Sequence, residues 1–264
     1  MKRYLTLILA ILSFDTIGQD FFFNKAKFEI TIGGGILLPV GSYANNSTTY
    51  FAQNVQSALI DTEFYYVETI FAKKRNASAR RGTDLNLEIN FLHNQRLVHG
   101  ISLGSSRNAA DLTKANAYFA NLQFPYIVSS QEDYRVRYLA YSLGYRLIIK
   151  QIQIRPYQKI GIAQMNFPYY QLESTGFQSP WSFIHEGNKP KLSSLYLESG
   201  FLTIISLSSR VNLGLNLSYR WADFDYTMYK RAVPGGSVPV IVPDQVNLRA
   251  IQTGIRLGYT FSRE

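Results

Sequence analysis

Cysteine is absent from this sequence of 264 residues. The absence excludes disulfides, thiolate-bound zinc and a lipid anchor on an N-terminal cysteine. Charged residues make up only 17% of the chain, which is low for a soluble domain. Yet beyond the N-terminus no uncharged apolar run is long enough for a transmembrane helix. Aromatic residues reach 14%, which favours strands and interfaces. The length of 264 residues is enough for one large β-domain or two small ones.

The N-terminal stretch "MKRYLTLILAILSFDTIGQD" has the features of a secretory signal. Lys2 and Arg3 form a basic region, Tyr4 to Phe14 is apolar, and the small residue Gly18 precedes Gln19. The apolar part is too short to cross a bilayer as a helix. We therefore expect residues 1–19 to be a signal peptide and residues 20–264 to be a single exported domain.

The chain is basic, with a formal net charge of +9. Such a charge suits either nucleic acid or the phosphates of lipid headgroups. The densest basic segment, "KKRNASARR", contains Lys73, Lys74, Arg75, Arg80 and Arg81. In an exported protein this segment is interpreted as a solvated loop facing anionic sugar and phosphate, so no nucleic-acid partner is predicted.

Strict alternation marks the stretch "VNLGLNLSYRWADF". Odd positions from Val211 to Trp221 are apolar, and even positions from Asn212 to Arg220 are polar or glycine. Side chains on a strand alternate between faces, so this is a β-strand with one apolar and one polar face. In a soluble protein the apolar face is inside, whereas in an outer-membrane barrel it faces lipid.

Eight segments share this alternation. They are Phe28–Val40, Leu85–Leu92, Arg96–Ser106, Tyr134–Ile149, Ile152–Met165, Lys191–Ile205, Val211–Phe224 and Val246–Phe261. The connections between them are alternately long and short. This layout predicts an all-β fold, an eight-stranded antiparallel up-and-down transmembrane β-barrel with short periplasmic turns and long extracellular loops.

Glycine indicates which face of the strands is inside. Ten strand glycines fall on the polar face, and only Gly34 falls on the apolar face. Glycine weakens a strand, so a water-exposed face gains nothing from it, whereas a crowded interior needs the space. The polar face is therefore predicted to line the barrel and the apolar face to meet lipid, which places the protein in the bacterial outer membrane.

The same parity places charged residues in the lumen. The predicted lumen charge network comprises Glu29, Glu88, Glu198, Arg146, Arg155, Lys159 and Arg256. Eight strands enclose a space that side chains can fill, and charges there must pair or reach water. We expect a packed plug in which Arg146, Lys159 and Arg256 reach Glu88 and Glu198. The alternation along their strands also points Arg96 and Arg220 inward, but both are expected to lie at the rims, in water.

Several outward residues are predicted to lie at the two membrane interfaces. An aromatic girdle is expected from Tyr219, Trp221, Tyr259 and Phe261. Three outward basic residues lie at the loop ends of their strands: Arg137, Lys191 and Arg249. These three are candidates for contacts with phosphates of outer-leaflet lipid, the alternative being that they extend into water.

The mature chain resembles the small outer-membrane β-barrel proteins of the PorT-like family of Bacteroidetes. The resemblance rests on the signal ending near Gln19, the triple glycine Gly33–Gly35, the eight strands and the terminal "LGYTF". It implies a barrel with a structural or export-related role. Three residues follow the terminal aromatic, which departs from barrels that end on Phe.

The motifs for chemistry are weak. "GISLG", Gly100 to Gly104, matches the G-x-S-x-G pattern of serine hydrolases, but Ser102 lies within a strand and lacks the required strand-to-helix turn. His93, His99 and His185 have no metal-ligand spacing. No enzyme activity, metal or cofactor is therefore predicted. The stretch "NAADLTKANAYFANL" has the composition of one or two helical turns within the second long loop.

Four functional classes stay open. The preferred one is an integral outer-membrane barrel with a structural or interaction role, such as anchoring, partner binding or membership of an export apparatus. The alternatives are a narrow solute pore, a lipid-modifying enzyme, and a secreted soluble barrel with an apolar interior. The expected partners are outer-membrane lipid or lipopolysaccharide and another envelope protein, with the chain itself a monomer.

Overall fold

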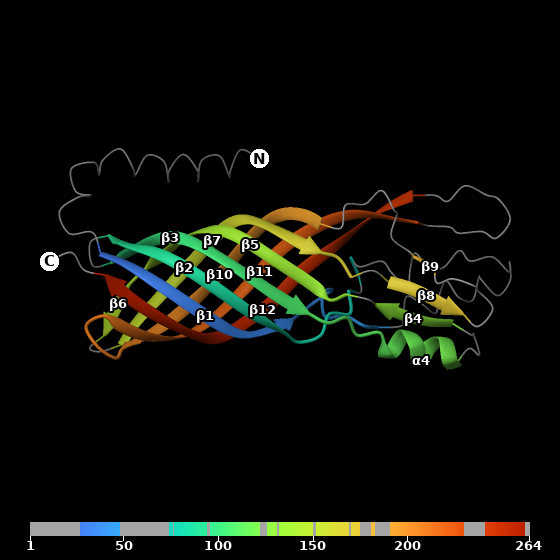
Figure 1. The fold of residues 1–264 in the computed structure, drawn as a ribbon, viewed down its shortest axis with the longest axis horizontal. Coiled ribbons are helices and arrows are strands. Elements are labelled where there is room, and N and C mark those ends of the chain that lie inside the picture. The colour runs from blue at the N-terminus through green and yellow to red at the C-terminus, as the bar shows by residue number, and fades with distance from the viewer. Residues whose placement is uncertain are drawn as a thin grey trace.

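In the computed structural model, each long strand pairs antiparallel with the next one along the chain (Figure 1). The structure describes residues 27–47, 74–75, 77–93, 96–121, 126–130, 132–149, 152–168, 170–174, 181–182, 191–229 and 241–261. The expected signal peptide, residues 1–19, and most of the first long loop lie outside these residues, as do Lys73 and His185.

Eight strands of the described chain form the barrel. They are β1 (Lys27–Pro39), β2 (Gly82–His93), β3 (Leu97–Asn108), β5 (Tyr134–Tyr145), β7 (Ile152–Asn166), β10 (Lys191–Ser206), β11 (Val211–Tyr229) and β12 (Ile241–Phe261). A short strand, β6 (Leu147–Ile149), continues β5 past Arg146 and pairs with the beginning of β7. Pairing of β1 with β12, from Phe28 opposite Phe261 to Pro39 opposite Ala250, closes the sheet. The prediction of a closed eight-stranded up-and-down barrel is confirmed.

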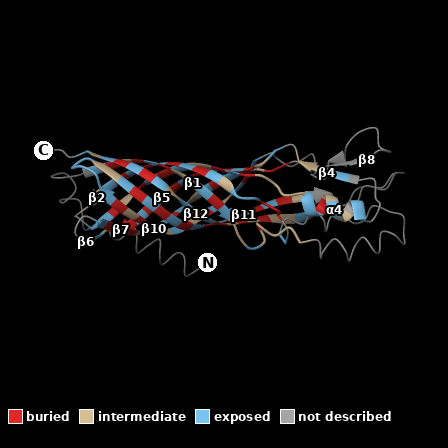
Figure 2. Cartoon of the chain, turned by 90° about the horizontal axis from the view of Figure 1, so that it is seen from below, coloured by how far each residue is buried: buried red, intermediate tan, exposed pale blue. Residues whose placement is uncertain are grey.

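The barrel is apolar outside and largely polar inside. Along β5 all twelve residues alternate between buried and exposed, and the same alternation runs through the barrel strands (Figure 2). Large apolar side chains are exposed on the outer face, including Leu85 at 67%, Ile162 at 64% and Ile255 at 58%. Soluble proteins rarely expose such a continuous apolar band, so the exterior of the barrel is suited to contact with lipid.

Two glycines on the inner face lie where no larger residue would fit. A Cβ atom on Gly104 would lie 2.3 Å from the ring of Tyr138, and one on Gly33 would lie 2.9 Å from Cγ of Arg256. Both glycines therefore make room for large side chains in the lumen. On the outer face, a Cβ on Gly34 would meet only the end of Leu85 at 3.3 Å and the Asp84 carbonyl oxygen at 3.6 Å.

The long connections carry additional structure at the end of the barrel opposite the short turns (Figure 1). Helix α4 (Thr113–Asn121) confirms the expected helical turns. A three-stranded sheet of β4 (Tyr126–Ser130), β8 (Tyr170–Ser174) and β9 (Trp181–Ser182) was not predicted. None of the described helices is both long and apolar enough to cross a membrane.

Strands β11 and β12 extend past the barrel as a long hairpin. Their pairing continues to Tyr229 opposite Ile241, five residues beyond each predicted boundary. The alternation continues there, because Phe224 and Tyr226 are buried while Asp225 is exposed. We call residues 222–229 and 241–248, together with α4, β4, β8 and β9, the headpiece.

One apolar cluster, the upper core, joins the loop-side half of the lumen to the headpiece. Within it, Tyr134 packs edge-on against Tyr43 at 5.4 Å and against Phe167 at 6.1 Å. Phe167 in turn lies 4.7 Å from Tyr226 of the hairpin. The Tyr134 hydroxyl donates to the carbonyl of Ala77 at 2.7 Å, which holds that segment over the barrel. The alternation of the strands alone predicts a polar interior along the whole barrel. The upper core corrects this prediction, because the loop-side half of the interior is largely apolar.

Candidate functional site in the barrel lumen

Eight charged side chains lie buried in the described part of the lumen. The lumen network consists of the acids Glu29, Asp84, Glu88 and Glu198 and the bases Arg155, Lys159, Arg220 and Arg256. None of the eight residues is more than 4% exposed. Four negative and four positive charges give the network a formal net charge of zero.

Glu88 and Glu198 are the centre of the network. Glu88 accepts hydrogen bonds from Arg256 Nη1 at 2.6 Å and from Lys159 Nζ. Glu198 lies 3.2 Å from Arg220 Nε and 3.6 Å from Lys159 Nζ. The hydroxyls of two tyrosines, Tyr157 at 2.7 Å and Tyr196, also donate to Glu198. Each carboxylate is thereby surrounded by donors, as a buried charge requires.

The loop-side part of the network is a bidentate ion pair. Arg220 Nη1 and Nη2 donate to the two carboxylate oxygens of Asp84 at 2.5 Å and 2.9 Å. Arg220 is on β11 and Asp84 is on β2, and these strands are not neighbours in the sheet. The pair therefore connects two separate parts of the barrel wall through the lumen.

The turn-side part of the network contains one more ion pair. Arg155 Nη1 lies 3.1 Å from Glu29 Oε1, and Asn212 donates to the other oxygen of Glu29 at 3.2 Å. A small apolar cluster of Tyr157, Leu202 and Ile204 is also buried in the barrel. Paired charges and apolar side chains thus occupy the described lumen from the short turns to the headpiece.

Six of the seven residues predicted for the lumen network lie in it. The exception is Arg146, which is half-buried near the short turns and donates to Gln153 Oε1 at 2.9 Å. It contacts neither Glu88 nor Glu198, because it interrupts the strand between β5 and β6, at the far end of the lumen from Asp84. Arg96 is exposed at that same rim, as expected.

The expectation that Arg220 lies at the rim in water is wrong. This residue is 1% exposed, and it makes ion pairs with both Asp84 and Glu198. The error came from the strand boundary, because β11 extends to Tyr229 and the upper core closes the lumen beyond Arg220. Asp84 was missed for the same kind of reason. Asp84 is on the same strand face as Asn86 and Glu88, but the predicted strand begins only at Leu85.

Neutral polar residues complete the network. Ser102, the serine of the "GISLG" motif, is fully buried and receives a hydrogen bond from Lys159 Nζ at 3.1 Å. It also lies 3.4 Å from Glu88 Oε1, to which it donates. Its position in the middle of a strand is that of a structural residue. His99 faces outward between Phe91 and Tyr141, and within the described chain no three potential ligands gather as a metal site.

The outward basic residues divide into two groups. Arg137 and Lys191 are exposed on the outer face, as expected. Arg249, however, forms an ion pair of 2.8 Å with Asp223 and lies over the ring of Trp221 at 4.9 Å. Its guanidinium also donates to the carbonyls of Ala222 and Leu248. Arg249 is therefore satisfied by the protein itself and is a poor candidate for a lipid phosphate.

The predicted girdle residues are all on the outer face. Trp221 and Tyr219 are 45% and 43% exposed at the loop side, and Tyr259 and Phe261 are each 38% exposed at the turn side. Phe261 stacks on Phe28 at 4.5 Å across the seam between β12 and β1.

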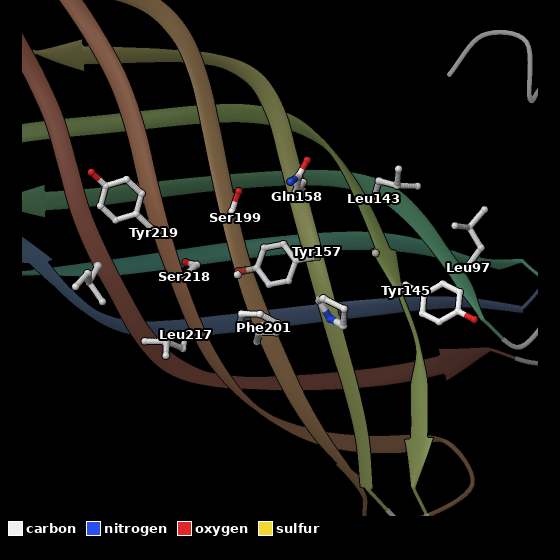
Figure 3. A pocket seen from close by; sticks show the side chains of 14 residues that line it. Leu97, Leu143, Tyr145, Tyr157, Gln158, Ser199, Phe201, Leu217, Ser218 and Tyr219 are labelled. Atoms are coloured by element: carbon white, nitrogen blue, oxygen red, sulfur yellow. The ribbon is translucent and has the colours of Figure 1, made fainter. Parts of the chain in front are cut away.

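A hollow of about 700 Å³ lies on the outer wall rather than in the lumen (Figure 3). Large side chains such as Leu143, Phe201 and Tyr219 surround it. Its lining includes two outward polar residues, Gln158 on β7 and Ser199 on β10, which are directly opposite in the register. The hollow is therefore a feature of the lipid-facing surface.

Above the barrel, Asp111 connects the end of β3 to α4. It accepts from Arg80 Nη2 at 2.8 Å and from the backbone of Thr113 at 3.1 Å. Burial alone would raise the pKa of Asp111, but the hydrogen bonds from Arg80 and Thr113 outweigh it and lower the pKa to about 2. The charges of Arg80 and Asp111 thus stabilise the start of the helix.

No protein-family model matches the sequence, and no curated relative matches it either. Among solved structures, it is similar to a major outer membrane protein of Thermus thermophilus, with 11% identity, a TM-score of 0.44, and coverage of 89% of this chain and 99% of that one. OprG of Pseudomonas aeruginosa gives 12% identity, a TM-score of 0.42, and coverage of 89% and 96%. The outer membrane protease OmpT of Escherichia coli gives 8% identity, a TM-score of 0.39, and coverage of 90% and 96%.

The class of the protein follows from its own geometry. A closed antiparallel barrel with an apolar exterior, aromatic residues at both edges and a charged interior is a transmembrane β-barrel. The chain is therefore an integral protein of the bacterial outer membrane, with the short turns on the periplasmic side and the headpiece outside the cell.

Proposed function

We propose that this protein is a structural and interaction protein of the outer membrane, whose sealed barrel anchors the extracellular headpiece. The observation that supports this proposal is the neutral lumen network. All eight of its charges are paired and almost fully buried. Opening such a network would leave an uncompensated charge in the lumen, which is strongly destabilising, so the side chains are expected to stay paired and the lumen filled.

The main alternative is a narrow solute pore. Selective pores are usually lined by rings of charge of one sign that remain accessible to the passing solute. Here the two signs are balanced and neutralise each other, and the upper core closes the loop side with apolar side chains. The anchor is therefore favoured over the pore.

The headpiece is the part that would bind a partner. Its hairpin packs into the upper core, so it is fixed to the barrel rather than tethered to it. Ile127 of β4 is 60% exposed, and β4 pairs with a single strand, β8, leaving its other edge open in the described sheet. An open edge and exposed apolar residues suit another protein. In keeping with the resemblance to the PorT-like family, the proposed partner is another envelope protein, bound by a monomeric barrel that also contacts outer-membrane lipid.

Two measurements test the proposal. In planar bilayers the purified protein should produce no discrete conductance steps, and regular steps in the wild-type protein would overturn the sealed barrel. A photo-crosslinking residue placed at Ile127 should form one defined adduct with an envelope protein in intact cells. The same residue at Ile255, which is 58% exposed on the lipid face, is the matched control and should not form that adduct. Equal labelling at both positions would contradict binding through the headpiece.

A further inference from the structure

Three arginines lie together on the outer face of the barrel, at its loop-side edge. Arg107 of β3 is directly opposite Arg135 of β5, and Arg137 is opposite Ser105, two residues closer to the membrane centre. All three side chains are exposed. Directly opposite residues place their Cβ atoms about 5 Å apart and diagonal neighbours about 7–8 Å apart. We call Arg107, Arg135 and Arg137 the arginine cluster.

The cluster carries more positive charge than the protein neutralises. Asp133 forms an ion pair with Arg107, and the exposed Glu132 is the next acid along the chain. Within the described residues, Arg135 and Arg137 make no side-chain hydrogen bond or ion pair. Like charges directly opposite on neighbouring strands destabilise a sheet, so an anion bound beside Arg135 and Arg137 would relieve the repulsion that Asp133 leaves.

The height of the cluster indicates which anion this is. Immediately below it, Leu103 and Leu139 are 48% and 53% exposed and belong to the lipid-facing band. Each step of two residues along a tilted strand rises by about 5 Å. Arg137 therefore lies at the edge of the apolar band, and Arg107 and Arg135 lie one step further out, at the level of lipid headgroups.

The distribution of charge around the rim supports the same conclusion. Arg135 is opposite Asn166, which is opposite the exposed Lys191, so the basic surface continues across β7 to β10. On the other side of the barrel, the outward Arg249 is neutralised by Asp223. The exposed Arg135, Arg137 and Lys191 therefore lie on the β3–β5–β7–β10 side of the described barrel.

We propose that the arginine cluster binds the phosphate of a phosphorylated glycolipid in the outer leaflet. Guanidinium groups match phosphate oxygens with paired, charge-assisted hydrogen bonds, and two or three of them can hold one phosphate. The acyl chains of such a lipid would lie along Leu103 and Leu139. This inference depends on the location of the barrel in the outer membrane and not on the role of the headpiece.

The test compares matched variants in detergent. Purified bis-phosphorylated lipid A is added to the wild-type protein, to an Arg135→Gln/Arg137→Gln double variant and to an Arg249→Gln control. Wild type and control should bind with equal affinity, and the double variant should bind roughly 30-fold more weakly, at about fivefold for each basic residue lost. Binding is measured by native mass spectrometry, which also shows that each variant is folded.

Two further probes identify the ligand. Dephosphorylated lipid A should bind wild type as weakly as bis-phosphorylated lipid A binds the double variant, and inorganic phosphate at the same concentration should not compete. Equal binding of lipid A by wild type and the double variant would overturn the proposal. So would effective competition by inorganic phosphate, because the cluster would then be a site for a free anion.

Discussion

Arg220 and Asp84 are 136 residues apart in sequence, yet they form a bidentate ion pair inside the barrel. Neither side chain is more than 1% exposed, so the pair is isolated from bulk water. It is also linked to Glu198 and, through Glu198, to Lys159 and Arg256. The stability of the wall therefore depends on partners that are distant along the chain.

Removal of one partner should expose this dependence. Asp84→Ala removes one of the two carboxylates paired with Arg220 and leaves the buried network with one uncompensated positive charge, and such a loss costs about 3–5 kcal/mol of unfolding free energy. The double variant Asp84→Ala/Arg220→Met should recover a large part of that loss, because no unpaired charge remains. Urea unfolding in lipid vesicles measures both effects. A double variant as unstable as Asp84→Ala would show that the broken ion pair is not the cause of the lost stability. Leu85→Val, on the lipid face, is the control and should leave the unfolding free energy nearly unchanged.

The glycines offer a test of which face is inside. Gly104→Ala places a methyl group against the ring of Tyr138, which is itself stacked on Tyr196 at 4.4 Å and cannot easily move. Overpacking of this kind costs about 1–3 kcal/mol. Gly34→Ala on the lipid face should have little effect. Thermal unfolding monitored by heat-dependent gel mobility compares the two variants, and similar losses at both positions would contradict the assignment of faces.

Gln158 is an amide on the lipid face, midway along β7. It makes no side-chain hydrogen bond to another described residue, so its exposure to lipid costs about 1–3 kcal/mol. Gln158→Leu should therefore stabilise the barrel in bilayers. Gln164→Leu, closer to the headgroups, is the matched control and should gain less. A loss of stability for Gln158→Leu would show instead that the amide has a binding partner in the membrane.

The contact between Asp111 and Arg80 should make the headpiece sensitive to acid. The pKa of Asp111 is lowered to about 2, whereas a free aspartate has a pKa of about 3.9. The stabilisation is therefore complete above about pH 4 and disappears as the pH falls toward 2. The pair is partly solvated, so the effect is small and local. After correction for the intrinsic pH dependence of amide exchange, the protection of α4 against hydrogen exchange should fall over this interval in wild type, and in Asp111→Asn it should be low already and the same across the interval.

Sequence reasoning predicted the barrel well because a period of two is imposed at every position of a membrane-spanning strand. Inside and outside could be distinguished because glycine, as at Gly104, is needed only where large side chains crowd the lumen. The ends of strands were harder to predict. The hairpin of β11 and β12 continues beyond the membrane, where burial against Phe167 replaces lipid as the reason for alternation. Because the strand and its buried face continue past Arg220, this residue lies inside the lumen network and not at the rim where it was expected.

Other features could not be predicted because they depend on distant contacts. Strands β4 and β8 pair residues 40 to 48 positions apart, from Ser130 opposite Tyr170 to Tyr126 opposite Ser174, and neither segment is long enough to indicate a strand alone. The upper core joins residues from five strands, helix α4 and two loops, so no local pattern identifies it. The neutralisation of Arg249 by Asp223 likewise depends on the register of β11 and β12, which parity does not give.

The uninterrupted ladder between β11 and β12 has a mechanical consequence. It runs from Val211 opposite Tyr259 to Tyr229 opposite Ile241, a length of about 60 Å that connects the periplasmic rim to the headpiece. A partner that pulls on the headpiece along this axis moves β11 and β12 together, so it loads in shear the backbone hydrogen bonds that β11 makes with β10 and that β12 makes with β1, instead of opening them one after another. The hairpin can therefore transmit tension from outside the cell into the barrel wall, and extraction by atomic force microscopy should require more force from its tip than from the short turns.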